Sequence, residues 1–234
     1  MSGDALPPDE HKAARVREMF DRVAPRYDLL NRVLTGGLDQ RWRRRALARA
    51  SVRAGDRLLD LACGTGDLCA LAHALGARVV GADFAGEMLR GAHARATGAA
   101  LVQADVACLP LADASVDVVT CGFALRNFVS LPRAFEEMAR VLRPGGRIAL
   151  LDVDRPTSRL LRAAHSLYFD RVVPWVGALV SDRQAYRYLP QSTVYLPPRG
   201  ELLALVAKAG FVDVRREGLM LGAAQIVLAR RLAS

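Results

Sequence analysis

Hydrophobic positions recur at helical spacing in the first fifty residues of the chain. Four apolar residues fall on one face of a first predicted helix: Val16, Met19, Phe20 and Val23. Pro25 interrupts this helix, a second follows at about 27–34, and Gly36 and Gly37 separate it from a third at about 41–50. The pattern predicts an N-terminal helical appendage over about residues 1–50, not a separate domain.

From residue 57 the pattern changes to short apolar runs that alternate with helical stretches. The runs predict buried parallel strands, at about 57–62, 78–83, 100–104, 116–121 and 147–153. Helices are predicted between them, at about 67–75, 87–95 and 132–142. Pro144, Gly145 and Gly146 predict a turn before the last strand. Such alternation implies right-handed crossovers and therefore an α/β fold, a doubly wound, mostly parallel sheet with helices on both faces.

The alternation stops after residue 153. An apolar helical insertion is predicted over about 154–198, followed by a helix at 201–209 and strands at 212–217 and 224–229. These last strands lack a long crossover, so we expect an antiparallel hairpin at the sheet edge, which completes seven strands. The whole chain, 1–234, is predicted to be one domain.

Composition is typical of a globular cytoplasmic protein, with 52% hydrophobic and 24% charged residues. The longest apolar run, Val172–Val180, is far shorter than the roughly 20 residues that span a bilayer, and the N-terminus carries no export signal. Four cysteines form no CxxC pair and predict reduced, mostly buried thiols rather than disulfides or a zinc site: Cys63, Cys69, Cys108 and Cys121. No metal site is expected.

A net charge of +9 leaves three explanations open: nucleic acid, an anionic membrane surface, or an arginine-rich composition. The densest basic cluster is RWRRR at residues 41–45, beside Arg49. It is either the solvated face of a helix or a patch near a membrane surface, where tryptophan and arginine are both favourable.

The segment LLDLACGTGD at residues 58–67 carries the strongest chemical signal. Gly64 and Gly66 follow a strand and precede a helix, so the backbone there can approach a ligand closely. A dinucleotide motif would have a third glycine where Cys69 stands, which counts against NAD. The segment instead resembles the first motif of class I methyltransferases. That resemblance implies that the loop with Thr65 receives the methionine part of S-adenosylmethionine, with Asp60 near its ammonium group. The alternative is a tight turn without a ligand.

Carboxylates also close the next two predicted strands. Asp83 could accept hydrogen bonds from both hydroxyls of a ribose. In class I methyltransferases the position of Asp105 faces the adenine amino group, and the following amide, here that of Val106, lies near the ring. Either aspartate could instead cap the helix or turn that follows it.

Arg126 and Asn127 follow the fourth strand and are unusual choices for packing alone. The Asn/Asp-Pro-Pro-Tyr/Phe element of adenine and cytosine methyltransferases is missing here, which disfavours methylation of nucleic-acid bases. The alternative is an exposed arginine beside a capping asparagine.

Several further segments resemble the ubiquinone/menaquinone biosynthesis C-methyltransferases, from about residue 15 to near the C-terminus. They are FDRVAPRYDLLN at 20–31, LRN at 125–127, ARVLRPGGR at 139–147, YRYLPQS at 186–192 and AGF at 209–211. The chain departs from the family pattern in DVDRP at 152–156, in LGAAQIVLA at 221–229, and in Gly122, where some members use a serine. These departures concern the substrate pocket rather than the cofactor site.

The resemblance implies methyl transfer from S-adenosylmethionine to a ring carbon of a prenylated quinol, demethylmenaquinol or a benzoquinol. We assign stabilisation of the developing oxyanion to Arg126, since arginine is a poor base, and positioning of a proton-accepting water to Asn127 and Tyr27. The segment at 154–198 would cover the prenyl chain, or else form core or a dimer face. A long prenyl tail favours peripheral contact with the inner membrane face.

Three other hypotheses remain at this stage: methylation of another small molecule, methylation of RNA, and a cofactor-binding protein without catalysis. Steep salt-dependent RNA binding would favour the second. The preference for demethylmenaquinol over a benzoquinol rests only on the arginine- and alanine-rich composition.

Overall fold

The computed structural model describes residues 9–154 and 195–233. The helical insertion predicted at 154–198 therefore lies almost wholly outside the described residues, as does the YRYLPQS segment at 186–192. No helix of the described part is long and apolar enough to cross a membrane.

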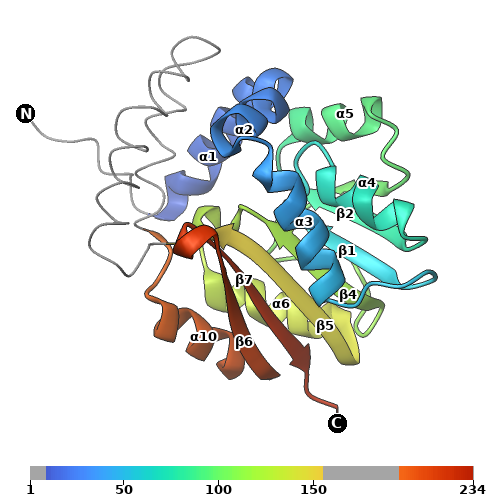
Figure 1. Cartoon of the computed structure of the whole chain (residues 1–234), viewed down its shortest axis with the longest axis vertical. Coiled ribbons are helices and arrows are strands. Elements are labelled where there is room, and N and C mark those ends of the chain that lie inside the picture. Colours follow the sequence, from blue (N-terminus) through green and yellow to red (C-terminus); the bar gives the residue numbers. More distant parts are fainter. Residues whose placement is uncertain (1–8, 155–194, 234) are drawn as a thin grey trace, which may run out of the picture.

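A seven-stranded sheet forms the centre of the fold, in the order β3-β2-β1-β4-β5-β7-β6 (Figure 1). Its strands are β1 (Arg57–Leu61), β2 (Arg78–Asp83), β3 (Ala100–Gln103), β4 (Val116–Gly122), β5 (Leu142–Val153), β6 (Phe211–Leu219) and β7 (Ala224–Arg231). The first five pair in parallel, and β7 runs antiparallel to both β5 and β6. The predicted doubly wound sheet and terminal hairpin are confirmed. Within the hairpin, β7 lies between β5 and β6, and β6 is the edge strand.

Helices cover both faces of the sheet (Figure 1). Those described between or after the strands are α4 (Asp67–Ala74), α5 (Gly86–Ala94), α6 (Leu131–Val141) and α10 (Arg199–Lys208). Alternate residues along each strand point to opposite faces. Leu58 and Val118 accordingly pack with α4, whereas their neighbours Leu59 and Val119 pack with α6 and α10. Each face thus has its own hydrophobic core.

Three helices and a 3₁₀ turn precede the sheet: α1 (Asp9–Val23), η1 (Ala24–Arg26), α2 (Tyr27–Thr35) and α3 (Leu38–Arg49). Pro25 lies in η1, so the predicted interruption is confirmed. Gly36 and Gly37 both have positive φ, +59° and +76°, which ends α2 and lets α3 begin at once. The third helix therefore starts at Leu38, three residues before the predicted position.

The start of β5 also differs from the prediction. The strand begins at Leu142, which pairs with Val116, and the register then shifts so that Arg147 pairs with Val118. Gly145 has a φ of +73° within this irregularity. The turn residues thus bulge out of a strand that continues past them, instead of preceding it.

Candidate active site

The turn between β1 and α4 lies at the carboxyl edge of the parallel strands. Its backbone is left-handed at Ala62, Gly64 and Gly66, with φ of +49°, +56° and +83°. The Gly64 N–H donates a 2.8 Å hydrogen bond to Oδ2 of Asp83, which joins this turn to the end of β2. Glycine adopts this backbone without strain at positions 64 and 66, whereas Ala62 adopts it at some cost.

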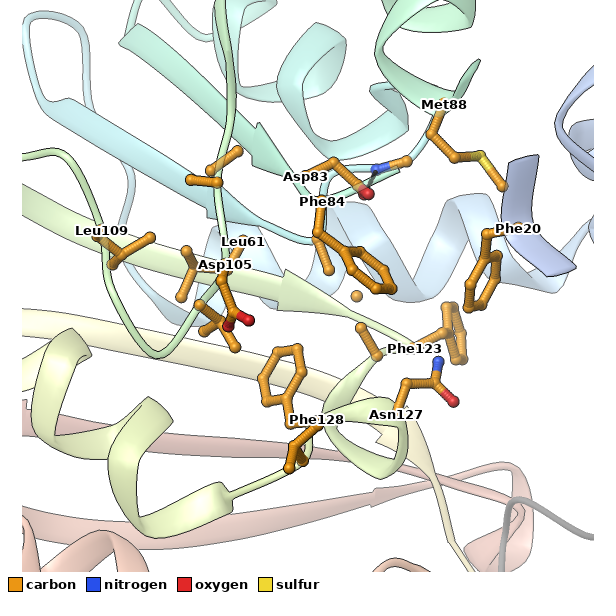
Figure 2. A pocket seen from close by; sticks show the side chains of 18 of the residues that line it. Phe20, Leu61, Asp83, Phe84, Met88, Asp105, Leu109, Phe123, Asn127 and Phe128 are labelled. Atoms are coloured by element: carbon orange, nitrogen blue, oxygen red, sulfur yellow. Dashed lines mark hydrogen bonds between the residues drawn. The ribbon is translucent and has the colours of Figure 1, made fainter. Parts of the chain in front are cut away.

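Two adjoining cavities open beside this loop. The larger, of about 770 Å³, contains aromatic side chains from several elements and is here called the aromatic cavity (Figure 2). The smaller, of about 290 Å³, contains mostly polar side chains and is called the polar cavity. Both are lined by Tyr27, Ala62, Gly64 and Gly122. They therefore form one site with an apolar and a polar part.

Most of the predicted site residues line these cavities. The aromatic cavity has Asp83, Asp105, Val106 and Asn127, the polar cavity has Asp60 and Thr65, and both have Tyr27 and Gly64. Gly66 and Arg126 line neither. Three strand ends and the N-terminal helices thus converge on one place, as the sequence predicted.

Asp83 is 5% exposed, and each of its carboxylate oxygens accepts a backbone hydrogen bond, Oδ2 from Gly64 and Oδ1 from Ala85 at 2.9 Å. The N-cap residue of α5 is Ala85 and no side chain caps this helix, so Asp83 does not have the alternative role of a helix cap. Each oxygen retains a free lone pair for a second donor. Burial raises the pKa of Asp83. A fixed carboxylate at the cavity wall suits a pair of ligand hydroxyls.

Asp105 is exposed at the opposite side of the aromatic cavity, and its Oδ1 accepts a 2.9 Å hydrogen bond from the Ala107 N–H (Figure 2). It too closes a local turn while facing the cavity. Both aspartates thus accept a hydrogen bond from the backbone N–H two residues later and also line the cavity.

Asp60 is 1% exposed and has only weak hydrogen-bond donors for a buried carboxylate. Its Oδ1 accepts from the Thr120 hydroxyl at 2.7 Å, and its Oδ2 accepts from the Cys69 thiol at 3.5 Å. Burial is the main cause that raises its pKa to about 7, while the charge of Arg43 acts in the opposite direction. A buried carboxylate so little compensated fits a cationic ligand group such as an ammonium.

Arg126 forms a buried ion pair at the base of the site. Its side chain is 6% exposed, and its Nη1 donates to Oδ1 of Asp152 at 2.5 Å and to the Phe123 carbonyl at 2.7 Å. Asp152 is the second-last residue of β5 and is fully buried. The guanidinium therefore holds the 3₁₀ turn η2 (Leu125–Asn127) against β5, and the predicted contact with a reacting oxygen has no counterpart in the cavity lining.

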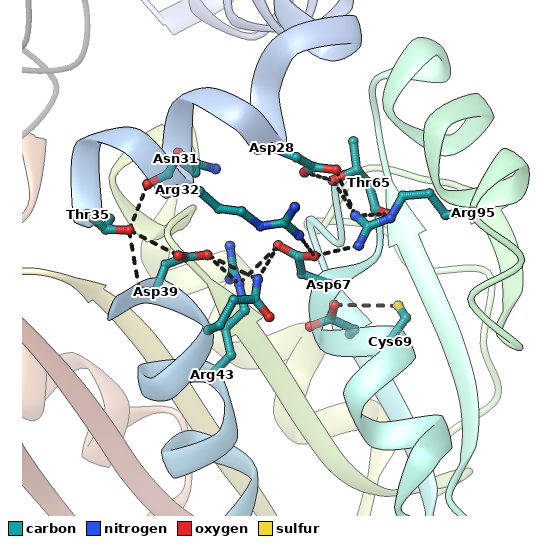
Figure 3. Close-up of polar contacts among 12 residues, drawn as sticks. Asp28, Asn31, Arg32, Thr35, Asp39, Arg43, Thr65, Asp67, Cys69 and Arg95 are labelled. Atoms are coloured by element: carbon teal, nitrogen blue, oxygen red, sulfur yellow. Dashed lines mark hydrogen bonds and ion pairs between the residues drawn. The ribbon is translucent and has the colours of Figure 1, made fainter. Parts of the chain in front are cut away.

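A polar network joins the N-terminal helices to the turn between β1 and α4 (Figure 3). Asp28 of α2 accepts hydrogen bonds from the Thr65 hydroxyl at 2.5 Å and from Arg95 Nη1 at 2.8 Å. Arg95 Nη2 donates to Asp67 at 2.8 Å. The network fixes the start of α2, and with it Tyr27, above the loop.

Apart from Tyr27, the aromatic side chains that line the aromatic cavity were not predicted as site residues. They are Phe20, Phe84, Phe123 and Phe128. Phe20 had been expected on the core face of the first helix, but it contacts the Tyr27 ring edge-on, with centroids 6.0 Å apart, at the cavity wall. Helical spacing alone could not distinguish a core side chain from a cavity side chain.

The basic cluster at 41–45 is only partly a solvated face. Arg43 is 5% exposed, Trp42 packs against Phe123, and Arg45 and Arg49 both form ion pairs with Glu217. Much of this charge therefore has partners within the chain, which weakens the case for a membrane-binding patch here.

Gly66→Ala is expected to lower the free energy of unfolding by about 2 kcal/mol, because a Cβ there would lie 2.6 Å from Thr97 Cγ2 in a left-handed backbone. Gly64→Ala is the matched control, since its Cβ would meet nothing nearer than 3.9 Å and only the backbone strain of about 1 kcal/mol remains. Urea unfolding measures both. Equal effects would show that packing against Thr97 is unimportant.

The cysteines of the described part follow the prediction, with three buried and Cys108 exposed, and all are free thiols. Cys63 lies in the turn between β1 and α4 and Cys69 in α4, and burial contributes to raising the pKa of both thiols. They are packing residues in the reduced state.

Comparison with known proteins identifies the family. The model of the ubiE/COQ5 methyltransferase family matches residues 9–231. A demethylmenaquinone methyltransferase from Thermus thermophilus is 46% identical over 215 residues, covering 89% of this chain and 97% of the relative. The ubiquinone/menaquinone biosynthesis C-methyltransferase UbiE of Syntrophotalea carbinolica is 43% identical, covering 87% and 88%.

Among solved structures, the [4+2]-cyclase SpnF superposes with a TM-score of 0.70 over the full length of both chains, at 17% identity. At that identity the likeness shows the fold alone, and a cyclase on this fold shows that fold does not fix the reaction. The family match and the long, well-covered relatives are more specific. This chain belongs to the ubiE/COQ5 methyltransferase family.

Proposed function

We propose that the protein transfers a methyl group from S-adenosylmethionine to a ring carbon of demethylmenaquinol, giving menaquinol. The observation that carries the proposal is the joined cavity, whose polar part adjoins the glycine loop and whose other part is lined by aromatic side chains that suit an apolar ring. The names of the Thermus thermophilus and Roseiflexus relatives, both demethylmenaquinone methyltransferases, favour the naphthoquinol.

The residues present fit S-adenosylmethionine. Asp83 faces the cavity with free lone pairs suited to ribose hydroxyls, and Asp60 offers a buried carboxylate for an ammonium group. Asp105 and Val106 line the far wall, where an adenine ring would lie against apolar neighbours. The cofactor supplies the methyl group in an electrophilic form, on a positively charged sulfur.

The chain's own contribution is to orient the quinol and to accept its proton. A quinol oxygen that loses its proton pushes electron density onto the neighbouring ring carbon, which makes that carbon nucleophilic. Asn127 and Tyr27 both line the aromatic cavity, so we assign to them the water that takes the proton. Arg126, in its ion pair with Asp152, is a positioning residue that holds Asn127 in place. The surrounding phenylalanines exclude bulk water and suit an apolar ring.

Contact with a membrane surface is part of the same proposal, because a long prenyl tail stays in lipid. Met220 and Leu221, in the turn η5 (Met220–Gly222) between β6 and β7, are 59% and 76% exposed. This turn lies at the same sheet edge as the cofactor loop, since Ala224 pairs with Val153 at the carboxyl end of β5. These apolar side chains support a membrane-facing orientation for that edge.

An assay of the purified protein with S-adenosylmethionine tests the function. Demethylmenaquinol should be methylated at least about tenfold faster than a 2-methoxy-6-polyprenyl-1,4-benzoquinol of equal chain length, as read by mass spectrometry of the extracted quinones. Asn127→Ala should lower kcat by about 100-fold and leave the affinity for S-adenosylhomocysteine within about threefold. Turnover of neither quinol, with the cofactor product bound, would contradict the proposed substrate class.

A further inference from the structure

Arg43 of α3 reaches the polar cavity although sequence motifs gave it no role. Its side chain is 6% exposed, and it lines the cavity together with Asp60, Asp67 and Gly122. It also stacks over Phe123, with Cζ 5.1 Å from the ring centroid. A charged side chain held this firmly in a ligand cavity requires an explanation.

The neighbouring carboxylates do not use the hydrogen-bonding capacity of Arg43. Its Nε lies 3.7 Å from Asp39 Oδ2 and 3.5 Å from Asp67 Oδ2, within ion-pair distance but without a hydrogen bond, and this atom is buried. Among the described residues, the guanidinium donates no hydrogen bond at all. Figure 3 shows it between the two carboxylates, below Arg32.

Asp39 and Asp67 instead take their hydrogen bonds from other donors. Gln40 Nε2 donates to Asp67 Oδ2 at 2.8 Å and to Asp39 Oδ2 at 3.1 Å. Arg95 donates to the remaining oxygen of Asp67, and the Thr35 hydroxyl donates to that of Asp39. The two aspartates thus balance the charge of Arg43 while its planar set of donors stays available.

Gly122 provides the space that Arg43 occupies. A Cβ at this position would lie 2.7 Å from Arg43 Nη1 and 3.0 Å from Leu68 Cδ1. A side chain on this strand end would therefore force the guanidinium to shift from its present position. The glycine, where some resembling proteins have serine, and the arginine form a matched pair in this chain.

We propose that Arg43 binds the α-carboxylate of the amino-acid part of S-adenosylmethionine, while Asp60 on the same cavity binds the α-ammonium. The inference rests on the proposed function for the identity of the cofactor. An acidic and a basic side chain that share one small cavity match a zwitterion, and a guanidinium offers a carboxylate two parallel donors. Arg43 is then a specificity residue, because it makes the protein bind the intact cofactor more tightly than analogues without the carboxylate.

Calorimetric binding of two ligands tests the proposal: S-adenosylhomocysteine, and its decarboxylated analogue, which keeps the ammonium. The wild-type protein should prefer the first by about 30-fold. Arg43→Gln should reduce this preference to about threefold or less, mainly by weakening S-adenosylhomocysteine. Arg32→Gln is the matched control, because Arg32 also lies 3.6 Å from Asp67 but is 48% exposed and lines neither cavity. It should keep the wild-type preference.

Arg43→Lys provides a second variant that keeps a positive charge between Asp39 and Asp67 if the glutamine variant does not fold. Its single ammonium group should give an intermediate preference of about tenfold. An unchanged preference in either folded Arg43 variant, or no preference in the wild type, would overturn the assignment. If the wild type binds neither ligand, the proposed function is contradicted as well. If it binds S-adenosylhomocysteine tightly and the Arg43 variants bind it equally well, only the role of Arg43 is contradicted.

Discussion

Asp152→Ala is expected to lower the free energy of unfolding by about 3–5 kcal/mol, because it removes a buried carboxylate that pairs with the buried guanidinium of Arg126. Both side chains of the pair are buried, since Arg126 is 6% exposed and Asp152 is fully buried. Arg126 Nη1 lies 2.5 Å from Asp152 Oδ1. The same Oδ1 of Asp152 also accepts the Val153 N–H at 2.7 Å, so the backbone loses a partner too. Unfolding in guanidinium chloride, followed by circular dichroism, measures the effect.

Two controls separate burial of charge from loss of any ion pair. Asp113→Ala removes a 2.7 Å partner of Arg140 whose side chain is 78% exposed, and it should cost less than about 1 kcal/mol. The double variant Arg126→Met/Asp152→Leu should regain most of the lost stability, since matched apolar side chains replace both charges. If Asp152→Ala were as stable as Asp113→Ala, the ion pair would not support the site.

The double variant also tests the positioning role of Arg126. Its fold should be intact and its affinity for S-adenosylhomocysteine near that of the wild type, because neither side chain lines the cavities. Its kcat for the quinol should nevertheless fall, since the η2 turn that carries Asn127 loses its attachment to β5. A purely structural role would leave kcat unchanged once stability is regained.

The sheet was predictable because each strand is bounded by residues that the pattern marks clearly. For β2, the charged side chains of Arg78 and Asp83 enclose an apolar run, and the observed strand has these limits. The start of β5 was not predictable, because the pairing of Leu142 with Val116 is a contact between distant segments. The position of β7 beside β5 is a long-range pairing of the same kind, and a local pattern contains no information on it.

For the site, the aspartates at the carboxyl ends of β1, β2 and β3 were predictable because the ends of parallel strands meet at one edge. The role of Arg43 was not, since it lies in a run of arginines that reads as a solvated face. Its burial depends on Asp67, which is 24 positions away in the sequence, and on the missing side chain of Gly122. Burial of a charge is decided by the partners that the fold supplies.

Asp60→Asn is expected to stabilise the ligand-free protein at pH 8 by about 4 kcal/mol and to have little effect at pH 4. Folding raises the pKa of Asp60 from 3.8 to about 7, mainly by burial, so the folded state binds this proton more tightly than the unfolded state. Stability from this group is therefore present below pH 4 and is lost as the pH rises through about 7, and three pKa units correspond to about 4 kcal/mol. Asparagine does not titrate and avoids this loss.

Asp60→Asn is expected to weaken ligand binding although it stabilises the ligand-free protein, so the two measurements separate the two roles of Asp60. Under the proposed function, Asp60→Asn should weaken S-adenosylhomocysteine by at least about tenfold at pH 7.5, because the ammonium loses its charge partner. Wild-type affinity should rise between pH 5.5 and 7.5 as Asp60 ionises, a change that burial and the charge of Asp83 oppose and the charge of Arg43 favours. The variant should show a flat profile.

Asp83→Asn is the matched control, because burial raises the pKa of Asp83 as well. Its two partners are backbone N–H groups, which cannot reverse their polarity, so the new NH₂ group would face a donor at Gly64 or Ala85. Asp60 has a hydroxyl and a thiol as partners, and both can turn to suit an amide. Asp83→Asn should therefore destabilise the protein at pH 8 while Asp60→Asn stabilises it. If both substitutions destabilised the protein, the buried Asp60 carboxylate would contribute to stability through its packing. The idea that it lowers stability in order to bind a cationic ligand would then be contradicted.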